Sequence, residues 1–273
     1  MMNVVRHVPP SVFNIHNEAV VEFLSGDNAT KCVYRHQIDA VLSARVQLRD
    51  PTQPNIALVV LPTGCGKTGV AVLAAYALNA SRVLVITPSE KISVQIYQDF
   101  CGSADSSKSC FLVERGIILE AEADSVCPSG HYITHSSMIH QCRRDYFMVV
   151  NAHKIGGRSK VRIEDIPKAN YDLVIVDEAH HYPADTWRLL VDHFENSRRL
   201  FITATPEHNG QRILPGYDPC YELARHKAIE IGIIRPIKFD EVQGEPFMEV
   251  CEFNVHTTTL YVQIVYMACM SDN

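Results

Sequence analysis

Short apolar runs alternate with helix-forming segments along much of the chain. Five runs are almost entirely apolar, and each has the length of one buried strand: residues 56–61, 82–87, 146–151, 173–176 and 200–203. Helical spacing of apolar residues follows several of them, over residues 67–78, 90–100 and 184–194, and Ser89 is a candidate N-cap for the second of these helices. Strands that are apolar throughout are typical of a parallel sheet covered on both faces, so the pattern predicts the α/β class.

The pattern is weaker in two other parts of the chain. Residues 101–145 contain scattered Gly, Ser and Cys, which predicts an insertion with little regular structure. After Pro206 the pattern predicts a helix over residues 223–231 and a last strand over residues 237–242. Residues 247–273 match no element.

Composition bounds the class of protein. Twenty-five Lys and Arg against 31 Asp and Glu give a net charge of −6, which argues against a strongly basic nucleic-acid module but leaves room for a local basic groove. Nine cysteines without a CxxC pair favour a reducing compartment. No apolar run approaches the roughly 18–20 residues that span a bilayer, and no secretory signal is visible. We therefore expect an intracellular protein, nuclear or cytoplasmic, with no membrane partner.

A glycine-rich segment lies between the first apolar run and the first predicted helix. It consists of Pro62, Thr63, Gly64, Cys65, Gly66, Lys67 and Thr68. Such a turn points backbone N–H groups at a phosphate, Lys67 can reach the β- and γ-phosphates, and the Thr68 hydroxyl can ligate Mg²⁺. The general pattern has Gly or Ala where this chain has Leu61. A chance turn with a surface lysine is the alternative, and the strand-turn-helix context favours phosphate binding.

Acidic residues follow the run at residues 173–176. Asp177 and Glu178 come at the carboxyl end of this predicted strand, so they should face the same crevice as the glycine-rich turn. We expect Asp177 to hold Mg²⁺ and Glu178 to polarise the attacking water. His180 could bond to a neighbouring strand end and report on the nucleotide, whereas His181 is a weaker candidate.

These segments together resemble the first RecA-like domain of superfamily 2 helicases, of the DEAH-type or restriction-enzyme-like group. Residues 62–68 resemble helicase motif I, residues 177–180 motif II and residues 201–206 motif III. The resemblance covers about residues 30–240. It implies a RecA-like P-loop NTPase fold, a three-layer sandwich with a mainly parallel sheet, and ATP and Mg²⁺ as cofactors.

Weaker matches extend the resemblance. Residues 34–37 resemble the Q-type motif, in which Gln37 would read adenine while Tyr34 or Arg35 packs on the base. Residues 87–89 resemble motif Ia. The resemblance implies nucleic-acid contact or coupling roles for Thr87, Pro88, Asn151, His153, His180, Thr203, Ala204 and Thr205.

The resemblance also divides the chain. It implies an N-terminal extension over residues 1–29, an ATP-binding domain over residues 30–242 with the insertion at 101–145, and an unassigned tail over residues 243–273. Family members need a second RecA-like domain that supplies arginine fingers, and the residues after Pro206 are too few for one. We therefore expect an ATP hydrolase that is weak as an isolated chain, that partners DNA or RNA, and that needs a second RecA-like domain in trans. The alternative is a non-catalytic nucleotide-binding or partner-binding module derived from a helicase.

Two further clusters invite a functional interpretation. The first consists of Cys110, Cys127, His131, His135, His140 and Cys142. It lacks a CxxC pair, so zinc is disfavoured and loop side chains are the preferred interpretation. The second consists of Arg143, Arg144, Lys154, Arg158, Lys160 and Arg162. It could line a groove for a nucleic-acid backbone with Tyr146 and Phe147 available for stacking, or it could be a solvated face with both aromatics in the core.

Overall fold

The computed structural model describes residues 11–103, 107–133, 138, 146–155, 162–182, 184–208, 210–236, 249–255 and 258–264. The chain divides into two compact units between Ile234 and Arg235. No described helix is both long enough and apolar enough to cross a membrane.

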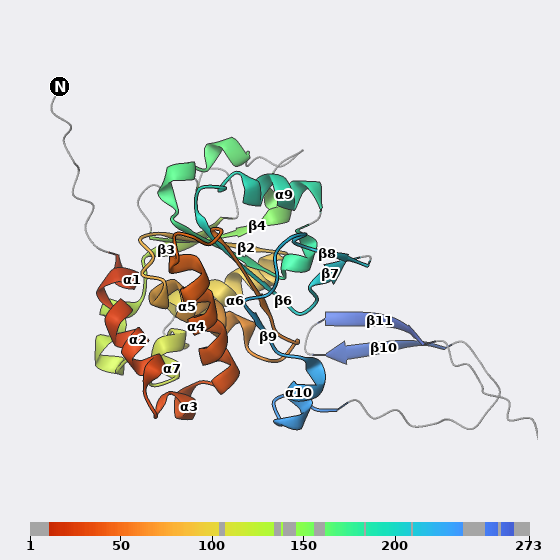
Figure 1. Ribbon diagram of the computed structural model, residues 1–273, viewed down its shortest axis with the longest axis horizontal. Coiled ribbons are helices and arrows are strands. Elements are labelled where there is room, and N and C mark those ends of the chain that lie inside the picture. The colour runs from red at the N-terminus through yellow and green to blue at the C-terminus, as the bar shows by residue number, and fades with distance from the viewer. Residues whose placement is uncertain are drawn as a thin grey trace, which may run out of the picture. The chain divides into compact units, whose positions relative to one another are not determined.

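A seven-stranded, all-parallel sheet forms the centre of the first unit (Figure 1). Its order is β3-β4-β2-β5-β6-β1-β9. Five strands coincide with the five apolar runs: β1 (Ile56–Val60), β2 (Val83–Thr87), β4 (Phe147–Asn151), β5 (Leu173–Asp177) and β6 (Arg198–Thr203). Every residue of β1, β2, β4 and β5 is buried, as expected for strands covered on both faces. The predicted α/β class and parallel sheet are confirmed.

Helices cover both faces of this sheet. On one face lie α4 (Arg35–Arg49), α5 (Lys67–Ala77) and α6 (Glu90–Cys101), and they share one apolar core with the sheet. On the other face lies α9 (Asp185–Asp192), whose Trp187 and Leu190 belong to a second core. Ser89 accepts a hydrogen bond from the Ile92 N–H, which confirms it as the N-cap of α6. The result is a three-layer sandwich.

Two strands of the sheet were not predicted. Strand β3 (Gly130–Ile133) pairs with β4 at one edge, and β9 (Tyr221–Glu222) pairs with β1 at the other. Strand β3 lies in the segment expected to have little regular structure, so that expectation is wrong there. The same segment also contains α7 (Phe111–Glu114) and α8 (Ala123–Val126). Strand β3 has four residues, of which only the first and the last are buried, so it is too short and too irregular to give a periodicity signal.

Residues before position 30 contribute to the first core. Helices α1 (Val12–Ile15), α2 (Asn17–Ser25) and α3 (Ala29–Cys32) precede α4, and α1 and α2 contact α5. Phe13 is fully buried, with its ring centroid 4.9 Å from that of Tyr76. Ser11 and Asn14 form a capping box at the start of α1. Residues of the segment predicted as an N-terminal extension therefore pack into the first apolar core.

Short elements complete the described chain. The 3₁₀ turns are Glu120–Glu122, Ala152–Lys154, Ile163–Asp165, Lys168–Asn170 and Ala179–His181. A small hairpin of β7 (Glu207–His208) and β8 (Gln211–Arg212) follows β6. Helix α10 (Arg225–Glu230) confirms the helix predicted over residues 223–231. The strand predicted over residues 237–242 lies outside the described residues.

The second unit contains an antiparallel hairpin of β10 (Glu249–Val255) and β11 (Thr258–Ile264). Its register pairs Glu249 with Ile264 at one end and Val255 with Thr258 at the other. The sequence had assigned no element to this tail. The mixed polar and apolar residues of both strands give no clean alternation, which is why the pattern did not predict them.

Gly130 provides a test of β3 as a structural strand. A Cβ at this position would lie 2.4 Å from the Phe147 carbonyl oxygen, so the backbone of β3 or β4 must shift to accept it. We expect Gly130→Ala to lower the free energy of unfolding by about 1–3 kcal/mol, measured by urea denaturation. The control is Gly26→Ala, where the nearest atoms are 3.4 and 3.5 Å away. Equal stability of the two variants would contradict the close pairing of β3 with β4.

Candidate active site

The candidate site lies at the carboxyl ends of β1, β6 and β5, which are neighbours in the sheet. The register pairs Val60 with Thr203 and Ile202 with Asp177. The Leu61 N–H donates to the Thr203 carbonyl at 2.9 Å and extends this pairing to the start of the glycine-rich loop. Because parallel strands end at the same edge, segments far apart in sequence meet there, as predicted for an open α/β sheet.

The loop from Pro62 to Gly66 turns the chain from β1 into α5. Gly64 has a φ of 90° and Gly66 a φ of 73°, a region that side chains with a Cβ rarely adopt. Gly66 is the N-cap of α5, so the loop opens onto the positive end of the helix dipole. Leu61, which departs from the general pattern, is fully buried. Its side chain belongs to the first core and does not prevent the turn.

Lys67 and Glu178 form an ion pair across this edge. Lys67 Nζ lies 3.1 Å from Glu178 Oε1, and the two side chains are 10% and 24% exposed. Glu178 itself has a φ of 50°, a left-handed conformation that is rare for a residue with a side chain. Backbone strain of this kind persists where the surrounding structure imposes it and is frequent at functional sites. The loop lysine and the acidic strand end, predicted separately, therefore face each other.

Asp177 lies at the end of β5 and is 8% exposed. Burial, followed by the adjacent charge of Glu178, raises the pKa of Asp177 from 3.8 to about 6, although Lys67 opposes the rise. The half-buried Thr68 at the start of α5 supplies a hydroxyl oxygen on the same edge. Carboxylate and hydroxyl oxygens fit a hard divalent cation, and the cost of ionising the buried Asp177 is what a cation would relieve. These two residues could thus hold Mg²⁺.

The pKa of Asp177 leads to a stability prediction. In the unfolded chain this carboxyl loses its proton near pH 4, but the folded protein keeps it up to about pH 6. The folded state binds more protons between these values, so its stability falls as the pH rises through them. In EDTA and without nucleotide, Asp177→Asn should raise the free energy of unfolding at pH 7.5 by at most about 3 kcal/mol. The variant should therefore melt at a higher temperature than wild type at this pH, and the difference should shrink at pH 4.5.

The control for this prediction is Asp165→Asn. A hydrogen bond from Arg162 lowers the pKa of the partly exposed Asp165, so its replacement should give no stability gain at pH 7.5. Thermal melts at both pH values measure the difference. A gain for Asp177→Asn that is the same at both pH values would contradict the raised pKa.

His180 lies beside Glu178. Its Nδ1 is 3.4 Å from Glu178 Oε2, without hydrogen-bond geometry, and it has no hydrogen-bond partner among the described residues. Its ring contacts His181, and His181 stacks on the buried Trp187. His180 therefore faces the second acid rather than a neighbouring strand end, where the sequence had placed its bond. The His181 ring, stacked on Trp187, packs against the His180 ring and restricts its orientation.

Thr203 and Thr205 shape the turn after β6. The buried Thr203 hydroxyl accepts from the Thr205 N–H at 3.2 Å and lies 3.1 Å from the Thr205 carbonyl oxygen, to which it can donate. Ala204 is half-buried and Thr205 is exposed. Thr203 and Thr205 therefore connect the end of β6, which borders the glycine-rich loop, to the protein surface.

The predicted nucleic-acid residues at the ends of β2 and β4 also lie together. The register pairs Thr87 with Asn151. Both are buried: the Thr87 hydroxyl shares a 2.6 Å hydrogen bond with Ser93, and the Asn151 side chain accepts from the His153 N–H at 2.9 Å. Pro88 is half-buried and His153 exposed. Of this set, His153 and Pro88 are accessible to a ligand, while Thr87 and Asn151 hold the turns in shape.

Residues 34–37 begin α4 and contact the glycine-rich loop. Gln37 is buried, and its amide donates to the Gly66 carbonyl at 2.9 Å and accepts from the Tyr34 N–H at 3.0 Å. Tyr34 is 53% exposed. Arg35 is exposed and forms a 2.9 Å ion pair with Asp39. His36, which sequence reasoning did not single out, bonds to the Cys65 carbonyl at 2.7 Å. Only its place beside Gln37 could have indicated this contact.

The two clusters of the middle segment are only partly described. Seven of their residues lie outside the described residues: His135, His140, Cys142, Arg143, Arg144, Arg158 and Lys160. Within the described residues, no group of three His, Cys, Asp or Glu side chains is arranged to hold a metal. Lys154 and Arg162 form ion pairs with Glu90 and Asp165. Phe147 is fully buried in the core and so is not available for stacking.

The family assignment follows from residues 31–208, which match the family model ResIII, described as type III restriction enzyme, res subunit. This chain belongs to the ResIII family. The match spans the glycine-rich loop, the acidic strand end and the turn after β6. The ResIII chain is accordingly a helicase-type ATP-binding domain with a RecA-like fold, as the sequence resemblance implied.

Solved structures with a similar fold come from several helicase-related proteins. A fragment of an HsdR subunit of a type I restriction enzyme from Vibrio vulnificus YJ016 is 19% identical, with a TM-score of 0.48, 72% of this chain covered and 31% of that chain. The UvsW helicase from bacteriophage T4 is 15% identical, with a TM-score of 0.40 and coverages of 63% and 52%. A protein described as a hypothetical ATP-dependent RNA helicase from Sulfolobus tokodaii is 15% identical, with a TM-score of 0.47 and coverages of 77% and 57%.

The ResIII chain spans less than two thirds of each of these three proteins. A search of curated proteins found no significant match.

Proposed function

We propose that this ResIII chain binds ATP with Mg²⁺ and hydrolyses it in response to a nucleic acid. The observation that carries the proposal is the Lys67–Glu178 ion pair at the N-terminus of α5, with the buried Asp177 next to Glu178 in the chain. Phosphoryl transfer to water requires a positive charge at the phosphates, a carboxylate that can ligate a metal and a second carboxylate for the water, and all three groups lie at the carboxyl edge of the sheet.

Each residue has a role in this proposal. Lys67 and the N–H groups of the loop neutralise the β- and γ-phosphates, while Thr68 and Asp177 hold Mg²⁺. Bound Mg²⁺ supplies positive charge that stabilises the charge developing on the phosphates. Glu178 orients the attacking water and accepts its proton. When Lys67 binds a phosphate of the nucleotide, its ion pair with Glu178 breaks and the Glu178 carboxylate becomes available to the water. Exposed Tyr34 offers a ring for the base.

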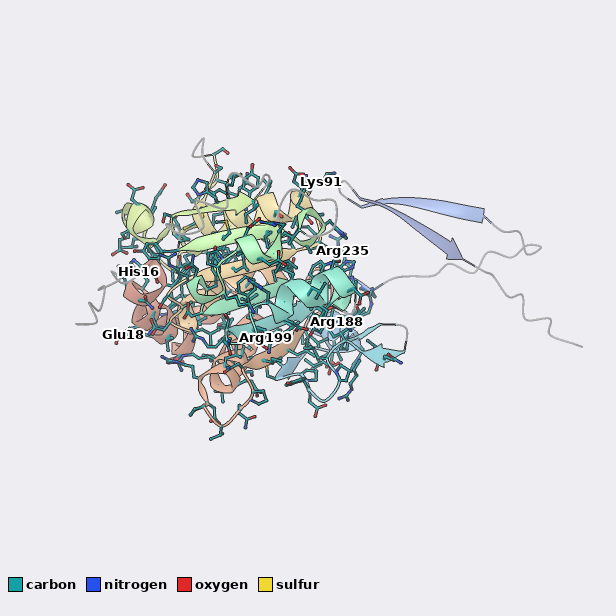
Figure 2. The ribbon with its side chains drawn as sticks, turned by 90° about the horizontal axis from the view of Figure 1, so that it is seen from above. His16, Glu18, Lys91, Arg188, Arg199 and Arg235 are labelled. Atoms are coloured by element: carbon teal, nitrogen blue, oxygen red, sulfur yellow. The ribbon has the colours of Figure 1, made fainter. Side chains whose placement is uncertain are left out.

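The nucleic acid would bind along the same carboxyl edge of the sheet. Exposed His153 and Thr205 and half-buried Pro88 and Ala204 lie in the turns after β4, β6 and β2. The first turns of α6 and α9 add Lys91 and Arg188, which Figure 2 shows away from His16 and Glu18 near α2. Cations near this edge can contact a phosphate backbone despite the net negative charge. A second RecA-like domain in trans would supply arginine across the ATP site.

The experiment is ATP hydrolysis measured with and without single-stranded DNA or RNA. Because the family description names a restriction enzyme, DNA is the polymer to test first. Turnover that rises with nucleic acid and is lost in Lys67→Ala and Glu178→Gln supports the proposal. ATP binding with no turnover under any condition would contradict hydrolysis and favour a non-catalytic module.

A further inference from the structure

The first turn of α4 contacts two successive carbonyl groups of the glycine-rich loop. His36 Nε2 lies 2.7 Å from the Cys65 oxygen, in a buried contact, and Gln37 Nε2 lies 2.9 Å from the Gly66 oxygen. Both side chains are buried, with His36 only 3% exposed. Helix α4 packs along α5, so these contacts come from a rigid element rather than from the loop itself.

These contacts fix the direction of two N–H groups. Every peptide bond described is trans, and in a trans peptide the C=O and N–H point in opposite directions. Holding the Cys65 oxygen against α4 therefore turns the Gly66 N–H away from α4, and holding the Gly66 oxygen does the same for the Lys67 N–H. Among the described residues neither N–H has an acceptor, as expected at a helix N-terminus. Both are free for an anion.

The His36 contact matters more for the loop than the Gln37 contact, because the Cys65 carbonyl has no other donor within the described part of the chain. The Gly66 carbonyl, by contrast, also accepts from the Val70 N–H at 3.4 Å. Since a carbonyl can only accept, His36 must carry its proton on Nε2. The Tyr34 ring stacks on His36, with centroids 5.4 Å apart and planes 17° apart, and restricts the tilt of the imidazole. Without the imidazole, the peptide between Cys65 and Gly66 loses the bond that sets its orientation.

We propose that His36 is a positioning residue that aims the Gly66 N–H at the phosphate chain of a nucleoside triphosphate. The inference rests on the proposed function of the same loop. His36 acts through the peptide and does not touch the nucleotide. Its contribution is to hold the peptide between Cys65 and Gly66 in one orientation before the nucleotide binds, so that binding does not have to order this peptide.

The test compares His36→Phe with His36→Gln. Phenylalanine keeps the ring under Tyr34 but removes the donor, whereas glutamine restores an N–H at similar reach. We expect His36→Phe to weaken ATP and ADP binding by about tenfold in calorimetric titrations with Mg²⁺, and His36→Gln to recover most of the affinity. In turnover assays KM should rise by about the same factor, with kcat changed much less.

The matched control is His193→Phe. His193 makes the same kind of contact, from Nε2 to the Ile166 carbonyl at 2.9 Å, but on the α9 side of the sheet. It should lower the melting temperature without changing nucleotide affinity. ATP affinity of His36→Phe within threefold of wild type would overturn the inference while leaving the proposed function intact. Failure of wild type to bind ATP would overturn both.

A measurement on wild type covers the case in which His36→Phe does not fold. In protein labelled with ¹⁵N, the His36 Nε2–H should exchange slowly with water, and inorganic pyrophosphate should shift the Gly66 amide among the strongest. Fast exchange of the imidazole proton together with an unshifted Gly66 amide would overturn the inference.

Discussion

Replacing Lys67 with alanine is expected to reduce ATP hydrolysis by about a thousandfold or more, to the level of the uncatalysed background. Lys67 Nζ lies 3.1 Å from Glu178 Oε1 and its side chain is only 10% exposed, so water cannot replace its charge at the proposed phosphate site. Its loss also removes the one charge that opposes the raised pKa of Asp177, so the carboxylate proposed to hold Mg²⁺ becomes harder to ionise. Both effects act in the same direction. The measurement is steady-state phosphate release with and without nucleic acid.

The control for this variant is Lys227→Ala. Lys227 also pairs with a glutamate, Glu230, at 3.0 Å, but on the exposed surface of α10. Its removal should leave hydrolysis unchanged, since exposed ion pairs contribute little. Hydrolysis by Lys67→Ala above a tenth of the wild-type rate would contradict the assignment of Lys67 to the phosphates.

Glu178→Gln is expected to separate binding from hydrolysis. Glutamine keeps the shape of the side chain but cannot accept a proton, so kcat should fall by about 10²–10⁴. ATP binding should persist or become tighter, because Lys67 no longer has to leave a carboxylate at 3.1 Å before it reaches phosphate. Titration with ATP and single-turnover kinetics measure the two quantities separately.

Glu230→Gln is the control, since it breaks a comparable lysine pair away from the site. A Glu178→Gln variant that fails to bind ATP would show that Glu178 supports the loop instead of the water. A variant that hydrolyses ATP normally would remove Glu178 from the chemistry altogether.

The central sheet was predictable because its strands are buried on both faces. Strands β1, β2, β4, β5 and β6 appear in the sequence as continuous apolar runs that no surface element imitates. The edge strand β3 was not predictable in the same way. Only its first and last residues are buried, and it is held by pairing with β4, which depends on a contact that local sequence does not encode.

The candidate site was predictable as far as chemistry is tied to spacing. The loop around Lys67 and the acids at 177 and 178 follow strands that end at one edge, so their meeting follows from the parallel topology. The Lys67–Glu178 ion pair and the approach of His180 to Glu178 depend on side-chain directions after β5, and these require the left-handed conformation of Glu178. No sequence pattern predicts such a conformation for glutamate.

The contacts of α4 with the phosphate loop show a further limit. Gln37 was expected to read adenine, yet its buried amide is bonded to the Gly66 carbonyl and the Tyr34 N–H. Its adenine contact stays a prediction. His36 was overlooked because a histidine in a helix carries no signal of its tertiary partner. Packing of α4 on α5 creates both contacts, and packing partners are not visible in a single sequence.

The most direct test of the central claim is an equilibrium titration of the chain with a non-hydrolysable ATP analogue, with Mg²⁺ or with EDTA. The account predicts one binding site per chain, weakened by EDTA, retained in Glu178→Gln and lost in Lys67→Ala. Absence of binding to wild type, or binding that survives Lys67→Ala unchanged, would contradict it.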